Sequence, residues 1–475
     1  MISVRARMGS SRRSTSSSWR TTKVQCPVLE NALGWFSRRL ARPILVVYGR
    51  GAAEGGKNLN RIALTWLGLT LTCVSSAFAQ GGPQAVTPAG AVPVFVFAGQ
   101  SNAVGVDTLD ELRADQLAPQ SNVLFYGPNE SGNLWGPLTP SSNSPNLIDG
   151  LNRTGGSFGP EISTGKTISN ALGGALVAEV KLAVGATALF DRWNPASGDL
   201  YHSMVARVNR SLADLQTQLG RPGYVAGFFW MQGESDAIAL RTDYAANLGN
   251  FIASVRRDFN NPNLPFVFGE IIDFDHPVST PLREQQQVVA DDNTVTNKAF
   301  ILTDDLCHHD FIHFNGQAIY ALGHRFGTGY LSIAGVSSAV HVSSTSTFGC
   351  NSIIGSGTVI NGGVSVGADA EIGANVTVNK SVQGGDNLTV GDGTRIDQDT
   401  ELGDNVSIGA NVIIGKDVVI SSGVAIGDNT TIGAGSIVGS NAQIGSSVKL
   451  GGSVTVAASA MVPNGTTIGA RKTFP

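Results

Sequence analysis

The sequence has little of several features that define protein classes. Four cysteines in 475 residues cannot build the dense disulfide framework of a small secreted domain. After residue 76, no uncharged apolar run reaches the ~20 residues that a membrane-spanning helix needs. Glycine is abundant, with 59 residues, but lacks the every-third spacing of collagen. The length therefore indicates about two to four globular units.

Positive charge is scarce in most of the chain. Residues 80–475 hold 20 Lys and Arg against 34 Asp and Glu, a net charge of −14. Residues 1–79, in contrast, hold 12 basic and 2 acidic residues. Because an acidic body repels polyanions, nucleic acid is excluded as an expected partner.

Residues 57–79 have the order of a secretory signal peptide. Lys57 and Arg61 precede an uncharged, mostly apolar stretch of 15 residues, and the small-x-small triplet Ala77-Phe78-Ala79 follows it. We therefore predict cleavage before Gln80 and export to a periplasmic or extracellular location. The alternative, a transmembrane anchor, requires a longer apolar run.

Two questions depend on that signal. Residues 1–56 are rich in Arg and Ser and precede a complete signal, so they are either a disordered leader or the product of a start codon assigned too far upstream. After cleavage only Cys307 and Cys350 remain, in a compartment where cysteines can pair. The sequence alone leaves open whether their geometry permits a disulfide.

Residues 80–332 have the pattern of an α/β domain with a largely parallel sheet. Short apolar runs alternate with amphipathic stretches such as 201–219 and 241–259, which we expect to be helices. The apolar runs, which we expect to be buried strands, are Val94–Ala98, Ala175–Val180, Tyr224–Trp230 and Phe266–Ile272. A segment rich in Ser, Val and Thr, 333–347, is the expected linker to the next domain.

Residues 348–470 follow a strict six-residue period. An apolar residue occupies 20 of the 21 positions that lie six apart from Phe348 to Ile468, and Gly directly follows 15 of the 21 positions. This pattern resembles the hexapeptide repeat of left-handed parallel β-helices, in which three hexads close one triangular coil. The resemblance implies that the apolar residues point inward and that Gly takes corners where a Cβ would clash.

The expected role of this β-helix is assembly or spacing. Its relatives include acyltransferases that use a histidine near a coil interface, but the last histidine here is His341, before the first hexad. No aromatic residue lies between Phe348 and Phe474, so the usual stacking platforms of sugar-binding modules are missing from the repeat. By analogy with these relatives we expect a trimer.

Two polar segments directly follow apolar runs of the predicted sheet. The first, Gly99-Gln100-Ser101-Asn102, places a serine at the carboxyl end of a strand, where ligands of α/β sheets usually bind. Helix amides beside such a serine can stabilise an oxyanion. The second, Trp230–Asp236, adds an amide and two carboxylates, from Gln232, Glu234 and Asp236. Helix capping is the alternative explanation for both segments.

A third polar segment, Asp310–Asn315, carries an acid and a histidine three residues apart. That spacing lets the Asp310 carboxylate contact one imidazole nitrogen of His313 and leaves the other free to accept a proton from a serine. His308 and His309 lie beside them, so a metal site is the alternative. No HExxH or paired-cysteine spacing supports zinc.

Together the segments resemble the SGNH (GDSL-like) hydrolase superfamily, in particular its sialate O-acetylesterase-like and acetylxylan-esterase-like branch. The matching blocks are GQSN at 99–102, WxQGExD at 230–236 and DxxH at 310–313. SFGPE at 157–161 looks like the remaining block. The resemblance spans roughly 94–326 and implies a three-layer, flavodoxin-like fold around a parallel sheet.

The resemblance also implies residue roles. Ser101 would be the nucleophile, His313 the general base and Asp310 the residue that orients the imidazole. The implied oxyanion hole consists of the Ser101 and Gly159 amides and the Gln232 side chain. The implied substrate pocket contains Gln100, Asn102 and Glu234, and we expect Glu234 to pair with Arg283. No metal or cofactor is implied.

The resulting hypothesis is an exported carbohydrate esterase that removes O-acetyl groups from a glycan. Trp135 and Trp193 are candidates for stacking on a sugar, although each fits a place in the core equally well. Two alternatives remain. The β-helix could act as an acyltransferase, or the chain could be a non-catalytic glycan-binding protein that retains an esterase-like fold.

Overall fold

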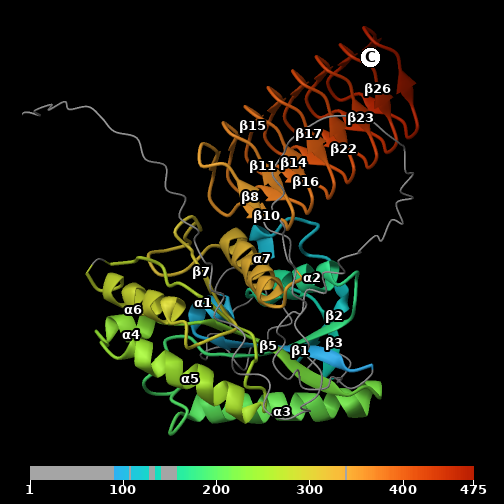
Figure 1. Ribbon diagram of the computed structural model, residues 1–475. Helices are drawn as coiled ribbons and strands as arrows, with labels where there is room; N and C mark the ends of the chain where they lie inside the picture. The colour runs from blue at the N-terminus through green and yellow to red at the C-terminus, as the bar shows by residue number, and fades with distance from the viewer. Residues whose placement is uncertain (1–89, 106–108, 128–133, 141–157, 276, 337–339) are drawn as a thin grey trace, which may run out of the picture. The chain divides into compact units, whose positions relative to one another are not determined.

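A central sheet organises the α/β domain of the computed structural model, which describes residues 90–105, 109–127, 134–140, 158–275, 277–336 and 340–475 (Figure 1). Its strands are Val92–Gly99 (β1), Gln120–Tyr126 (β2), Trp135–Leu138 (β3), Val177–Ala183 (β4), Gly223–Met231 (β5), Phe266–Gly269 (β6) and Lys298–Ile301 (β7). They lie in the order β3-β2-β4-β1-β5-β6-β7, and only β3 is antiparallel to its neighbour. The predicted parallel α/β domain is confirmed.

Helices cover both faces of this sheet. Successive side chains of β5 point to opposite faces of the sheet. Phe229 stacks on Phe326 on one face, and the adjacent Phe228 packs against Phe251 on the other. Phe326 belongs to α7 (Gly316–Ile333), which packs beside α2 (Glu161–Ala171). Phe251 belongs to α5 (Tyr244–Asp258), which shares its face with α3 (Asp199–Leu219) and neighbours α6 (Thr280–Asp291). The predicted helices 201–219 and 241–259 therefore correspond to α3 and α5.

The strand order creates a natural binding edge. The chain adds β2 and β4 on one side of β1, and then β5, β6 and β7 on the other. Ligands of open α/β sheets usually bind beside the carboxyl ends of the strands where the order reverses. Here that place is the end of β1, at Gly99.

The second domain is the expected left-handed β-helix. Two-residue strands succeed one another from β8 (His341–Val342) to β30 (Thr473–Phe474), and strands eighteen residues apart pair in parallel. Val359, for example, pairs with His341 on one side and with Thr377 on the other. The first strand corrects one predicted boundary, because residues 341–347 belong to the β-helix and not to a linker.

The corners of the β-helix differ from the expectation. Every sixth residue from Asn351 to Arg471 has a positive φ, and most of these are Asn, Asp, Ser or Gly, which tolerate the left-handed region. The Gly that follows each inward residue serves another purpose. A Cβ on Gly355 would lie 2.5 Å from the Gly373 carbonyl carbon of the next coil, so these glycines permit close stacking of coils.

The two cysteines that follow the predicted cleavage site form a disulfide, Cys307–Cys350. It joins the loop after β7 to the beginning of the β-helix, where the Cys307 N–H also donates to Asn351 Oδ1 at 2.7 Å. Within the described residues, no helix is both long and apolar enough to cross a membrane. The predicted leader and signal peptide, residues 1–79, lie outside the described residues.

His324 on α7 makes stability depend on pH. Its Nδ1 lies 3.0 Å from Thr167 Oγ1, and burial, together with the positive charges of Arg325 and Lys166, lowers its pKa to about 4. In the unfolded chain this histidine has its ordinary pKa, so between pH 6.5 and 4 the unfolded chain binds a proton that the folded chain does not. The free energy of unfolding therefore decreases as the pH is lowered through that window. Lowering the pH from 6.5 to 5 should reduce the free energy of unfolding by about 2 kcal/mol through this group, at about 1.4 kcal/mol per pH unit.

Urea unfolding at those two pH values tests this prediction. The His324→Gln variant should lose less stability than the wild type as the pH falls. His202, exposed on α3, provides the matched control His202→Gln, which should behave as the wild type. Equal losses in all three proteins would contradict the assignment.

Candidate active site

The end of β1 brings Ser101 to the carboxyl edge of the sheet. Gly99 has a φ of +147°, and a Cβ there would lie 2.0 Å from the Met231 carbonyl oxygen of β5. Only glycine therefore fits where β1 turns into the short helix α1 (Ser101–Val104). The turn leaves Ser101 as the first residue of α1, nearly buried at 9% exposure.

His313 and Asp310 extend from Ser101 in a continuous chain of contacts. Ser101 Oγ lies 3.0 Å from His313 Nε2, and His313 Nδ1 lies 2.8 Å from Asp310 Oδ2. The other Asp310 oxygen accepts the N–H groups of Ile312 and His313, each at 2.8 Å. Partial burial would raise the pKa of Asp310, but these hydrogen bonds outweigh it and lower that pKa. The acid is thus an anion that faces the imidazole.

Asn102 forms hydrogen bonds that connect α1 to the segment that carries His313. Its Nδ2 donates to the Ile312 carbonyl oxygen at 3.0 Å, and its Oδ1 accepts the Phe314 N–H at 3.2 Å. Nδ2 also donates to Glu234 Oε1 at 2.6 Å. Asn102 is fully buried, and its amide links α1 to the segment that carries His313. That Asn102 lines the substrate pocket stays a prediction.

Glu234 is likewise fully buried, and its place in the substrate pocket stays a prediction. Burial raises the pKa of its carboxyl, against the hydrogen bond from Asn102. The expected pair with Arg283 does not form. Arg283 instead contacts Glu270 at 2.9 Å, Asp273 at 3.6 Å and Asp304.

Gln232 and Gln100 form a closed network beneath the site. Gln232 Nε2 donates to the Thr187 carbonyl oxygen at 3.0 Å, to Gln100 Oε1 at 3.2 Å and to Asp236 Oδ2 at 2.7 Å. Gln100 Oε1 also accepts the Ser235 N–H at 3.2 Å. Both glutamines are buried, and Gln232 Nε2 and Gln100 Oε1 are engaged in this network. The oxyanion role of Gln232 and the pocket role of Gln100 stay predictions.

The Gly159 amide also has another acceptor. Its N–H donates to Glu161 Oε1 at 3.0 Å, while Glu161 Oε2 accepts from Lys181 Nζ at 2.8 Å. Lys181 donates in addition to the Val104 carbonyl oxygen at 2.9 Å. The expected oxyanion role of Gly159 is thus not met in this conformation, which leaves the N–H of Ser101 as the candidate donor. Ser157, in the same sequence block, lies outside the described residues.

Two family models match the chain. The model described as carbohydrate esterase, sialic acid-specific acetylesterase, matches residues 91–332, just over half of the sequence. The chain belongs to this esterase family. A second model, described as bacterial transferase hexapeptide (six repeats), matches residues 345–380 and 406–440 of the β-helix. The family resemblance drawn from the sequence blocks is confirmed for both domains.

Named relatives resemble the esterase domain. A probable carbohydrate esterase of Arabidopsis thaliana is 26% identical over 201 residues, which cover 39% of this chain and 71% of that protein. An X-ray structure of an Arabidopsis thaliana protein is 25% identical and covers 50% of this chain and 98% of its own, with a TM-score of 0.42. A carbohydrate acetylesterase from Xanthomonas citri is 18% identical and covers 53% of this chain and 58% of its own, with a TM-score of 0.38.

The tryptophans of the esterase domain are core residues. Trp193 is fully buried against Trp230, with ring centroids 5.3 Å apart, and its Nε1 donates to Thr187 Oγ1 at 2.8 Å. Trp135 is 2% exposed and its Nε1 donates to the Ser211 carbonyl oxygen at 2.9 Å. Neither tryptophan can stack on a sugar, and the alternative interpretation, that both are core residues, is confirmed.

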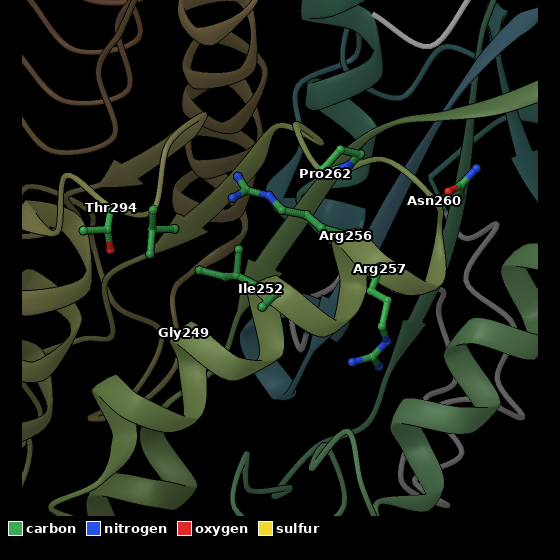
Figure 2. Close-up of a pocket in the computed structure, with 9 residues that line it drawn as sticks. Gly249, Ile252, Arg256, Arg257, Asn260, Pro262 and Thr294 are labelled. Carbon is green, nitrogen blue, oxygen red and sulfur yellow. The ribbon is translucent and has the colours of Figure 1, made fainter. Parts of the chain in front are cut away.

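A hollow of about 540 Å³ in the esterase domain lies away from Ser101 (Figure 2). Its walls come from the carboxyl-terminal half of α5 and from the loops that lead into β6 and β7, so it opens at the amino edge of the sheet. Arg256, which lines it, donates to the carbonyl oxygens of Leu264, Thr296 and Asn297. This arginine ties loops together, and the hollow has no part in the candidate active site.

Sequence reasoning missed two residues that support the site. Thr187 orients Gln232 from the loop after β4, and Lys181 neutralises Glu161 from within β4 itself. Lys181 within the mostly apolar strand β4 was the available signal, because Lys is almost never buried without a partner. For the histidines, the described residues contain no cluster of three or more His, Cys, Asp or Glu arranged to hold a metal.

Proposed function

We propose that this protein is a serine esterase that removes O-acetyl groups from a carbohydrate. The observation that carries the proposal is the chain of contacts from Ser101 Oγ to His313 Nε2 and from His313 Nδ1 to Asp310, at 3.0 and 2.8 Å. Membership of the carbohydrate esterase family supports the substrate class. This geometry suits two-step acyl transfer.

In the proposed mechanism, His313 Nε2 takes the hydroxyl proton as Ser101 Oγ attacks the ester carbonyl carbon. The Asp310 carboxylate holds the imidazole proton at Nδ1 and stabilises the imidazolium that forms. The oxyanion is stabilised by the Ser101 N–H at the start of α1. As the intermediate collapses, the C–O bond to the sugar breaks and His313 gives its proton to the leaving sugar oxygen. Water, deprotonated by His313, then hydrolyses the acetyl-Ser101 ester.

We further propose that the chain acts after export and assembles through its β-helix, as a trimer. The Cys307–Cys350 disulfide supports export, because such bonds persist mainly in oxidising compartments. The hexapeptide repeats support assembly.

One experiment tests the activity and the compartment together. The full chain is expressed with its leader, and protein from the periplasm or the medium is incubated with acetylated xylo-oligosaccharides and with p-nitrophenyl acetate. We expect acetate release, a mature chain that begins at Gln80, and labelling of Ser101 by a fluorophosphonate. Labelling of another residue alone would contradict the mechanism. Acetylation of a sugar from acetyl coenzyme A, without ester hydrolysis, would favour the acyltransferase alternative.

A further inference from the structure

An exposed aromatic side chain lies beside the candidate triad. Phe311 is 69% exposed and is the only exposed Phe, Tyr or Trp in the described part of the chain. It occupies the turn between Asp310 and His313. A single exposed apolar residue needs no explanation by itself. Phe311 becomes a candidate for contact with the substrate because it lies in the turn that carries both Asp310 and His313.

The turn that carries Phe311 is held in place. Asp310 Oδ1 accepts the N–H groups of Ile312 and His313, and Asn102 donates to the Ile312 carbonyl oxygen. The Phe311 backbone is therefore fixed relative to Ser101 before any ligand binds. A preorganised surface loses little entropy when it binds a ligand.

A second ring supports Phe311 from another loop. Phe274, in the loop after β6, packs edge-on against Phe311, with centroids 6.4 Å apart and planes inclined at 72°. Phe274 is partly buried, so it anchors the pair to the domain while Phe311 projects into solvent. Edge-to-face packing restricts the orientation of the outer ring.

We propose that Phe311, braced by Phe274, is a platform for the pyranose ring that carries the acetyl ester. The apolar C–H face of a sugar matches the face of an aromatic ring, and hydroxyl groups around the sugar edge remain free for polar contacts. This inference rests on the proposed function, since it assigns the sugar-binding part of the same site.

The charges around the two rings identify the class of sugar. Asp273 and Asp275 flank Phe274, and Asp310 precedes Phe311. Carboxylates can accept hydrogen bonds from sugar hydroxyls, but they repel an anionic sugar.

The nearby cation does not reverse this balance. Arg283 is shared among Glu270, Asp273 and Asp304, so three carboxylates surround one guanidinium. Among the described residues of these two loops and of α6 next to them, carboxylates therefore outnumber cations. The platform is suited to a neutral acetylated pyranose and disfavours a sialic acid.

The test compares a sugar ester with an ester that lacks a sugar. For Phe311→Ala, we expect kcat/KM on acetylated xylo-oligosaccharides to fall about tenfold relative to its value on p-nitrophenyl acetate, mainly through KM. Phe311→Tyr, which keeps the ring, should retain most of the wild-type ratio. Leu219→Ala, an exposed aliphatic at the opposite edge of the sheet, is the control and should leave both values unchanged.

The charge argument is tested with the wild type. Its kcat/KM should be higher on acetylated xylo-oligosaccharides than on 9-O-acetyl-N-acetylneuraminic acid, and the reverse order would overturn the neutral-sugar assignment. An unchanged ratio in Phe311→Ala would overturn the platform and leave the proposed function intact. Wild-type activity on the aryl acetate alone would overturn the platform and the carbohydrate part of the proposed function, and leave only a serine esterase. Inactivity on every ester would instead refute the proposed function, and the platform with it.

Discussion

Replacing Ser101 with alanine is expected to lower kcat for acetate release by at least about 10³-fold. The substitution removes the only hydroxyl that lies within hydrogen-bond distance of His313 Nε2, at 3.0 Å, among the described residues. Without that oxygen no acetyl-enzyme can form, and only uncatalysed attack by water on a bound ester remains. Initial rates with p-nitrophenyl acetate and with acetylated xylo-oligosaccharides measure the loss.

Two comparisons make the result specific. Ser203, exposed on α3, gives the control Ser203→Ala, which should keep wild-type activity. The double variant Ser101→Ala/His313→Ala should be no less active than Ser101→Ala alone, since residues that act as one unit have non-additive effects. If Ser101→Ala is folded and retains more than about a tenth of wild-type kcat, the proposed nucleophile is wrong.

The largest expected loss of stability comes from the charged cluster behind Gly159. The Lys181 and Glu161 side chains are only 7% and 2% exposed and form a 2.8 Å ion pair. In Lys181→Met, Glu161 remains buried without its cation, so we expect the free energy of unfolding to fall by about 3–5 kcal/mol. Urea denaturation followed by circular dichroism measures this change.

The neighbouring acid Glu179 does not replace the positive charge that Lys181→Met removes. Burial, and then repulsion from Glu161, raises the pKa of Glu179 well above its ordinary value, which favours the uncharged form of this carboxyl. The double variant Lys181→Met/Glu161→Gln removes both charges and should recover much of the lost stability. Lys416→Met, at an exposed lysine of the β-helix, should be nearly neutral. A loss in Lys181→Met no larger than in Lys416→Met would show that the pair contributes little.

Buried strands and coils were predictable because burial leaves a periodic signature. Strands covered on both faces consist mainly of apolar residues, so β1, β5 and β6 could be placed from sequence. Strand β4, which contains Glu179 and Lys181, was placed only in part. Strand β2, which lies between the edge strand β3 and β4, is partly exposed, and its mixed sequence QSNVLFY contains no such run. β3 contains Pro and Gly, which argue against a strand, and it forms only by pairing with β2.

For the site, residue types and sheet topology were sufficient to bring Ser101, Asp310 and His313 together. The direction of each amide was not predictable, because hydrogen bonds depend on tertiary neighbours that lie far away in sequence. Gln232 illustrates this limit, since its Nε2 is engaged by Thr187, 45 residues earlier. A motif predicts which side chains meet, but not which of them retain a free donor.

The disulfide between Cys307 and Cys350 has a consequence for protein engineering. Cys307 lies three residues before Asp310, so the disulfide ties one end of the segment that carries His313 to the β-helix. A shortened gene that stops at residue 340 would cut this anchor, and a swap of the repeat for a foreign fusion partner would do the same. The β-helix therefore cannot be deleted without loss of this cross-link, and a design that keeps only the first domain needs another way to hold that segment in place.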